Sequence, residues 1–118
     1  MATEIAGRSV AQLVCLALGV GVVASGLLGV AVVLETDRWH DALHLVSGAA
    51  LAVAALSRGS APRALVAFGA FYVAVALTGF VDGQQTLGLI PINPVDNLLH
   101  AGLAFVAFPA AIISRTRA

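Results

Sequence analysis

The stretch that decides the fold is NPVDNLLH, residues 93–100, which carries polar side chains and a histidine into an apolar run. An earlier stretch, DRWHDALH at residues 37–44, echoes it. Asp37 and Asn93 each suit the N-cap position of a helix, and His44 and His100 follow them at the same spacing. The sequence therefore predicts the same helix start twice, and with it an internal repeat.

The composition places the chain in a membrane. Hydrophobic residues make up 60% of the 118 residues and charged residues 10%, against about 25% charged in soluble domains. A soluble fold of this size cannot bury so much apolar surface. Six basic residues, all arginine, balance six acidic ones, so the charge predicts no nucleic-acid partner. The lipid bilayer is the expected surrounding, and the lone Cys15 cannot form an internal disulfide.

Four apolar segments predict the fold class. We expect an all-α membrane protein, one domain over residues 1–118, with transmembrane helices at about residues 10–34, 39–56, 64–81 and 95–113. The longest connection, residues 82–92, contains glycine, proline and paired glutamines, which are not typical of a continuous helix. Since each of the two echoed stretches begins the second helix of a pair, the four helices are expected to form two hairpins related as a parallel repeat.

Small residues and arginines predict packing and orientation. Gly21, Ser25 and Gly29 recur every four residues, which favours close approach of another helix, and a homo-oligomer or larger membrane complex through this stripe is an open expectation. Five of the six arginines, all except Arg38, fall near the two ends of the chain or in the middle loop. The positive-inside rule then predicts cytoplasmic termini in a bacterial cytoplasmic membrane, with both repeated helix starts outside.

The polar residues of the two repeated helix starts are expected to meet where the hairpins join. His40 and His44 are spaced i, i+4, and Asp96 and His100 repeat that spacing, so each pair lies on one face of its helix. With Asn97 they form the predicted cluster at the outer ends of the second and fourth helices. Three imidazoles and one carboxylate suit zinc or another transition metal. A haem between the two helices would have little room.

Three functions stay open for this cluster. The favoured one is a structural or accessory role without a cofactor, because carboxylates and amides stabilise helix starts and histidines can hydrogen-bond each other. The alternative is a transition-metal-binding module, with His40, His44, Asp96 and His100 as ligands. A small transporter or channel subunit is the further alternative, since titratable groups inside a membrane often mark a pathway.

Catalysis is not expected. Cys15, Ser25 and Ser47 are the candidate nucleophiles inside the apolar segments. By depth along the helices, only Ser47 has a histidine nearby, and that histidine, His44, is three residues away on the same helix. No nucleophile with an activating base is therefore predicted.

With these motifs in view, the chain resembles a bacterial family of small four-helix membrane proteins that is known only as a domain of unknown function. The family pattern is a duplicated Asn-x-x-[His/Asp]-Asn-x-x-His motif, each copy leading into a glycine-containing helix. The copy at residues 93–100 matches in full, whereas the copy at residues 37–44 has Asp37 and Asp41 where the family has asparagine. The resemblance implies a four-span integral membrane protein and no assigned activity.

Overall fold

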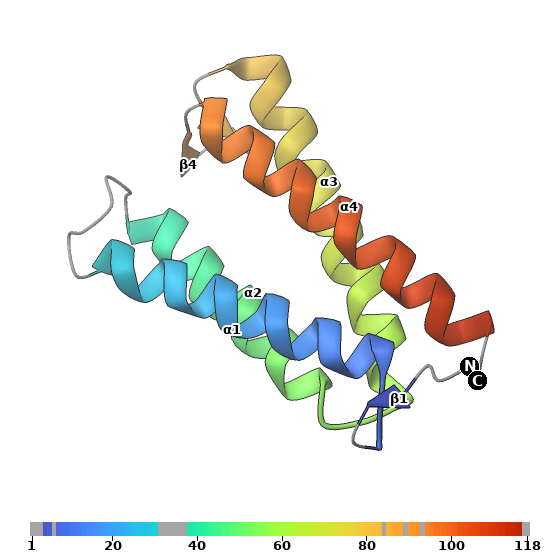
Figure 1. Cartoon of the computed structure of the whole chain (residues 1–118). Coiled ribbons are helices and arrows are strands. Elements are labelled where there is room, and N and C mark those ends of the chain that lie inside the picture. Colours follow the sequence, from blue (N-terminus) through green and yellow to red (C-terminus); the bar gives the residue numbers. More distant parts are fainter. Residues whose placement is uncertain are drawn as a thin grey trace.

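Four helices make up most of the protein (Figure 1). The computed structural model describes residues 4–5, 7–30, 38–83, 85–88, 90–92 and 94–116. The helices are α1 (Val10–Val30), α2 (Arg38–Ala54), α3 (Ser60–Asp82) and α4 (Pro94–Thr116). Two short antiparallel ladders accompany them: β1 (Glu4–Ile5) with β2 (Arg8–Ser9), and β3 (Gln85–Thr86) with β4 (Ile90–Pro91). The described chain is therefore helical, as the hydropathy predicts.

Three of the helices are long and apolar enough to cross a membrane, over Val10–Leu27, Ser60–Asp82 and Val95–Ser114. The fourth, α2, has 17 residues and is not among them. Large apolar side chains point outward, with Val20, Val81 and Phe105 each more than half exposed. An apolar exterior of this extent is unfavourable in water and favourable in lipid. The chain is thus a membrane protein with at least three helices suited to span the bilayer.

Helix α1 packs mainly against α2, and the two backbones touch at glycines. A Cβ atom added to Gly19 would lie 2.6 Å from the Ala52 nitrogen, and one added to Gly48 would lie 2.8 Å from the Gly19 oxygen. Of the predicted stripe, Gly21 faces open space within this chain, so the expected contact of the stripe with a second copy stays a prediction. The close contact runs instead through Gly19 and Gly26, which are two helical turns apart.

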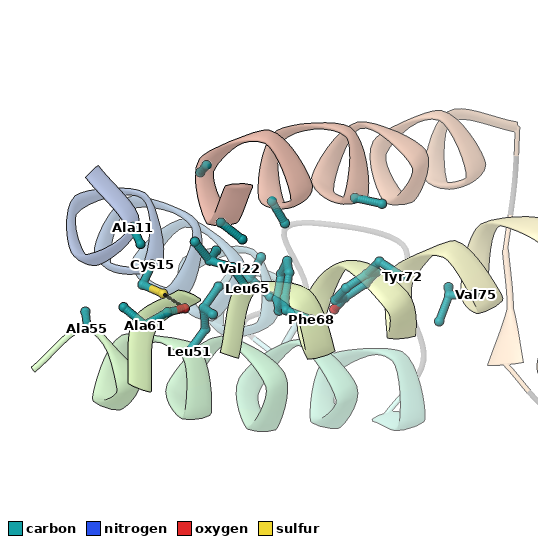
Figure 2. Close-up of a cluster of buried hydrophobic side chains, with 14 residues drawn as sticks. Ala11, Cys15, Val22, Leu51, Ala55, Ala61, Leu65, Phe68, Tyr72 and Val75 are labelled. Carbon is teal, nitrogen blue, oxygen red and sulfur yellow. Dashed lines mark hydrogen bonds between the residues drawn. The ribbon is translucent and has the colours of Figure 1, made fainter. Parts of the chain in front are cut away.

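Helix α3 packs mainly against α4, and alanines fill the core between the two helix pairs. Gly69 of α3 lies against the ring of Phe108 on α4. Figure 2 shows buried side chains of α1, α2 and α3 pointing into one shared space, where the Cys15 thiol donates a hydrogen bond to the Ala61 carbonyl. Such small side chains let helices approach without the hydrophobic drive available in water.

The first turn of α1 carries a capping box, which holds the helix start beside the ends of α2 and α4. The Ser9 hydroxyl accepts a hydrogen bond from the Gln12 backbone N–H at 3.1 Å, and the Gln12 side chain accepts one from the Ser9 N–H at 2.9 Å. Gln12 also donates to the Ala55 carbonyl, and the Ala11 N–H donates to the Ser114 hydroxyl. These bonds satisfy helix-terminal groups that lipid could not satisfy.

The connection between α3 and α4 folds back against α3 as the β3–β4 ladder. Gly83 ends α3 in the left-handed conformation, and Leu87 and Gly88 have positive φ at the turn of the ladder. The Thr86 hydroxyl is fully buried and donates a hydrogen bond to the Val75 carbonyl inside α3. Figure 1 shows β4 beside the first turns of α4, and β4 also lies beside α2. This connection therefore covers one end of the helix bundle.

Candidate metal centre

The three histidines of the chain lie together. Each offers a ring nitrogen, and the three nitrogens all lie within 4.8 Å of one another. His40 is 3% exposed, His100 is 2% exposed and His44 is partly buried. The ring centroids are 4.6 Å apart for His40 and His44, 5.7 Å for His40 and His100, and 5.8 Å for His44 and His100. Three imidazoles thus converge on one small buried volume.

Two helices from different pairs supply these rings. His40 and His44 are one turn apart on α2, which places them on one face of that helix. His100 comes from the second turn of α4. The Nε2 atoms of His40 and His44 lie 3.0 Å apart, within hydrogen-bond distance. The spacing within α2 sets the first pair, and the packing of the two helix pairs brings in the third ring.

Ser25 of α1 also belongs to the cluster, and this corrects the prediction made from depth along the helices. Its hydroxyl oxygen is hydrogen-bonded to Nδ1 of His44, across the α1–α2 interface. The prediction failed because it compared positions along the helices and took no account of which faces turn toward each other. Ser25 lies one residue before Gly26, where α1 approaches α2 closely, so its short side chain reaches the imidazole.

Tyr72 of α3 forms the inner wall of the cluster. Its side chain is fully buried, and its ring centroid lies 5.4 Å from that of His100 and 6.5 Å from that of His44. The phenol oxygen is 2.8 Å from the Ser47 hydroxyl, one turn along α2 from His44. Sequence reasoning did not assign Tyr72 to the site, although it is the only tyrosine in the chain.

Two other residues predicted for the cluster, Asp96 and Asn97, lie beside the histidines. Asp96 is partly buried and lies one turn before His100 on α4. It is not part of the close group of three nitrogens. Asn97 is buried and packs against Gly79 of α3, where its Oδ1 atom would collide with an added Cβ. The predicted caps Asp37 and Asn93 lie outside the described residues.

Two polar atoms of the predicted cluster, Oδ1 of Asn97 and Nδ1 of His100, are buried without a hydrogen-bond partner in the described structure. Buried polar atoms are almost always hydrogen-bonded in folded proteins, and leaving one unpaired costs about 1–3 kcal/mol. An unpaired ring nitrogen that carries a lone pair can also serve as a metal ligand. Nδ1 of His100 is therefore a candidate ligand atom.

The donor set suits a transition metal. Imidazole nitrogens bind zinc at about 2.0–2.1 Å, which in tetrahedral geometry separates two ligand nitrogens by about 3.3 Å. The 3.0 Å between the Nε2 atoms of His40 and His44 is within a few tenths of an ångström of that separation. Three protein ligands leave a fourth coordination position open.

A family model described as a domain of unknown function (DUF4383) matches residues 29–113. The chain belongs to this family. The part of the chain that matches DUF4383 contains α2, α3 and all but the last three residues of α4, and with them all three histidines, Tyr72 and Asp96. Ser25 lies outside the matched residues. No curated protein and no solved structure matches the chain.

Proposed function

We propose that this DUF4383 protein binds one transition-metal ion inside the membrane through His40, His44 and His100. The observation that carries the proposal is the convergence of three imidazole nitrogens, one from each histidine, within 4.8 Å of one another. His100 also has a buried and unpaired Nδ1 atom. Exposed histidines gather for many reasons, but two of these rings are almost fully buried. A metal would satisfy all three nitrogens at once.

Nitrogen ligands and the nearby carboxylate define the class of metal. Imidazole binds zinc, copper, nickel and iron, whereas magnesium and calcium prefer oxygen ligands. Asp96 lies one turn before His100 on α4, and it is our candidate for the fourth ligand or for a hydrogen-bond partner of one histidine. Zinc is therefore the first metal to test.

A structural role is the second candidate, and a specific observation favours it. His44 already has a hydrogen-bond partner at each nitrogen, Ser25 at Nδ1 and His40 at Nε2. Since His40 and His44 belong to α2 and His100 to α4, the cluster also joins the two helix pairs. On this alternative the histidines fasten the bundle, and no metal is needed.

We also propose that the bundle sits in a bacterial cytoplasmic membrane with both termini in the cytoplasm and with all four helices crossing. Arg8, Arg58 and Arg63, with the two arginines near the C-terminus, support this orientation. The first turn of α1 and the end of α4 are hydrogen-bonded to each other, so they share one face of the bundle. The preferred packing of α1 with α2 and of α3 with α4 supports two repeated hairpins.

Metal analysis of the purified protein tests the main proposal. The chain should be purified in detergent through a tag that contains no histidine, stripped with a chelator, and incubated with zinc or cobalt(II). Elemental analysis should find one metal per chain, and cobalt should give the absorption bands of a tetrahedral nitrogen site. A folded wild-type protein without metal above the level of the buffer would refute the proposal.

Two variants sharpen this experiment. His100→Phe keeps an aromatic ring beside Tyr72 but removes the ligand, so it should lose the metal and remain folded. Gln85→Ala, at an exposed position on β3, is the matched control and should keep it. Zinc at a concentration of 100 Kd should stabilise the wild type by about 2.7 kcal/mol, and should not stabilise His100→Phe. The structural alternative expects no stabilisation by zinc in either protein.

A further inference from the structure

The hydrogen bonds of Ser25 determine which nitrogen of His44 carries the proton. The Ser25 hydroxyl lies 3.0 Å from the Val22 carbonyl oxygen one turn earlier in α1. A carbonyl oxygen can only accept, and a hydroxyl has one proton, so Ser25 donates that proton to Val22. Its oxygen can then only accept at Nδ1 of His44. His44 Nδ1 therefore carries a hydrogen, and in the neutral ring Nε2 carries the lone pair.

This lone pair points toward the other histidines. Nε2 of His44 lies 3.0 Å from Nε2 of His40, so in the metal-free protein the hydrogen between them belongs to His40. A metal ion would replace that hydrogen and take the lone pairs of both Nε2 atoms. To bind the metal as a neutral ring, His40 would carry its proton on Nδ1 instead of on Nε2.

We infer that Ser25 is a positioning residue for the metal centre, which holds His44 with Nδ1 protonated and Nε2 presented to the metal. The inference rests on the proposed function. Histidine ligands in metalloproteins commonly donate their other N–H to an oxygen, and this bond sets both the tautomer and the ring orientation. Here that oxygen comes from α1, a helix that contributes no histidine.

Backbone packing fixes the position of Ser25. A Cβ atom added at the adjacent Gly26 would lie 2.9 Å from the Leu45 side chain and 3.1 Å from the Asp41 carbonyl oxygen. The α1 backbone is thus held against α2 at the turn that carries His44. These rigid contacts fix the orientation of the His44 ring before a metal binds. Such preorganisation raises the affinity of the site for the metal.

Metal titration of two Ser25 variants tests the inference. Ser25→Ala removes the acceptor and should weaken zinc binding by about 10–100-fold. Ser25→Thr keeps a hydroxyl that can bond to the carbonyl one turn earlier, and it should restore affinity to near the wild-type value. Ser47→Ala removes a hydroxyl that bonds to Tyr72 and to no histidine among the described contacts, so it serves as the matched control.

Nitrogen-15 NMR of histidine-labelled protein measures the tautomer of His44 directly. A purely structural role of Ser25 would leave this tautomer unchanged in Ser25→Ala. The metal-free wild type should show His44 as a single tautomer with Nδ1 protonated, and Ser25→Ala should show both tautomers. If Ser25→Ala does not fold, the wild-type spectrum decides alone, since a proton on Nε2 of His44 would overturn the inference.

The outcomes for the site and for Ser25 are separable. A wild type that binds zinc, together with a Ser25→Ala variant of equal affinity, would overturn the role of Ser25 and leave the metal site standing. A wild type that binds no metal but holds His44 in the Nδ1–H form would refute the metal site and retain the control of the tautomer by Ser25.

Discussion

Replacing Gly48 by alanine should destabilise the protein, because α1 and α2 touch through their backbones at this point. An added Cβ would meet the Gly19 carbonyl oxygen and the Val23 nitrogen, each at 2.8 Å. Ordinary contact begins at 3.4 Å, so the helices must separate by several tenths of an ångström. Backbone atoms cannot turn aside as a flexible side chain can. Overpacking of this kind costs about 1–3 kcal/mol.

A matched substitution isolates the contact. Gly21 lies on the same helix as Gly19, but a Cβ at Gly21 would meet nothing within 4 Å. Alanine is a better helix former than glycine by about 1 kcal/mol, so Gly21→Ala should be neutral or stabilising. Gly48→Ala gains the same helix propensity, so the difference in unfolding free energy between the two variants should be the overpacking cost of about 1–3 kcal/mol.

The assay is reversible unfolding in mixed micelles, in which a rising mole fraction of sodium dodecyl sulfate is followed by circular dichroism. Because Gly48 lies one turn after His44, its substitution should also lengthen the Ser25–His44 hydrogen bond and mix the tautomers of His44. Equal unfolding free energies for Gly48→Ala and Gly21→Ala would refute the reasoning, since the helices would then not be in backbone contact.

Two further substitutions test the surroundings of the cluster. Tyr72→Phe removes the phenol that bonds to Ser47 and should lower the unfolding free energy by about 0.5–1.5 kcal/mol in the same assay; no loss would mean that Ser47 finds another partner. Thr86→Val keeps the shape of the side chain but removes its bond to the Val75 carbonyl, so amide hydrogen exchange should accelerate in β3 and β4 while the middle of α3 stays protected. Unchanged exchange there would show that the ladder does not depend on this bond.

The helices and the residues of the cluster could be predicted from the sequence because the signals are local. Apolar runs bounded by polar residues define the helices, and the i, i+4 spacing places His40 and His44 on one face. The prediction of a family of unknown function is confirmed by the match to residues 29–113. That His100 of α4 joins the two histidines of α2 could be expected only from the assumed repeat.

The remaining contacts could not be predicted because they depend on how each helix is rotated about its axis. Glycines spaced by four and glycines spaced by seven both form stripes, and hydropathy does not decide between them when every face is apolar. The predicted stripe contains Gly21, whereas the contact of α1 with α2 runs through Gly19 and Gly26. For the same reason the sequence did not predict the hydrogen bond between Ser25 and His44, because their distance depends on the face that α1 turns toward α2.

The unpaired nitrogen of His100 favours a ligand role over a fastening role. Helices in a membrane could be joined through small apolar side chains, as Gly19 and Gly48 already do, without burying three imidazoles. A buried Nδ1 atom without a partner in the described structure destabilises the metal-free protein by about 1–3 kcal/mol. His100→Phe removes that atom and keeps a ring against Tyr72, so the metal-free variant should be at least as stable as the metal-free wild type. Because removing an unpaired buried atom is favourable under either role, a loss of stability in metal-free His100→Phe would show that Nδ1 of His100 has a partner after all.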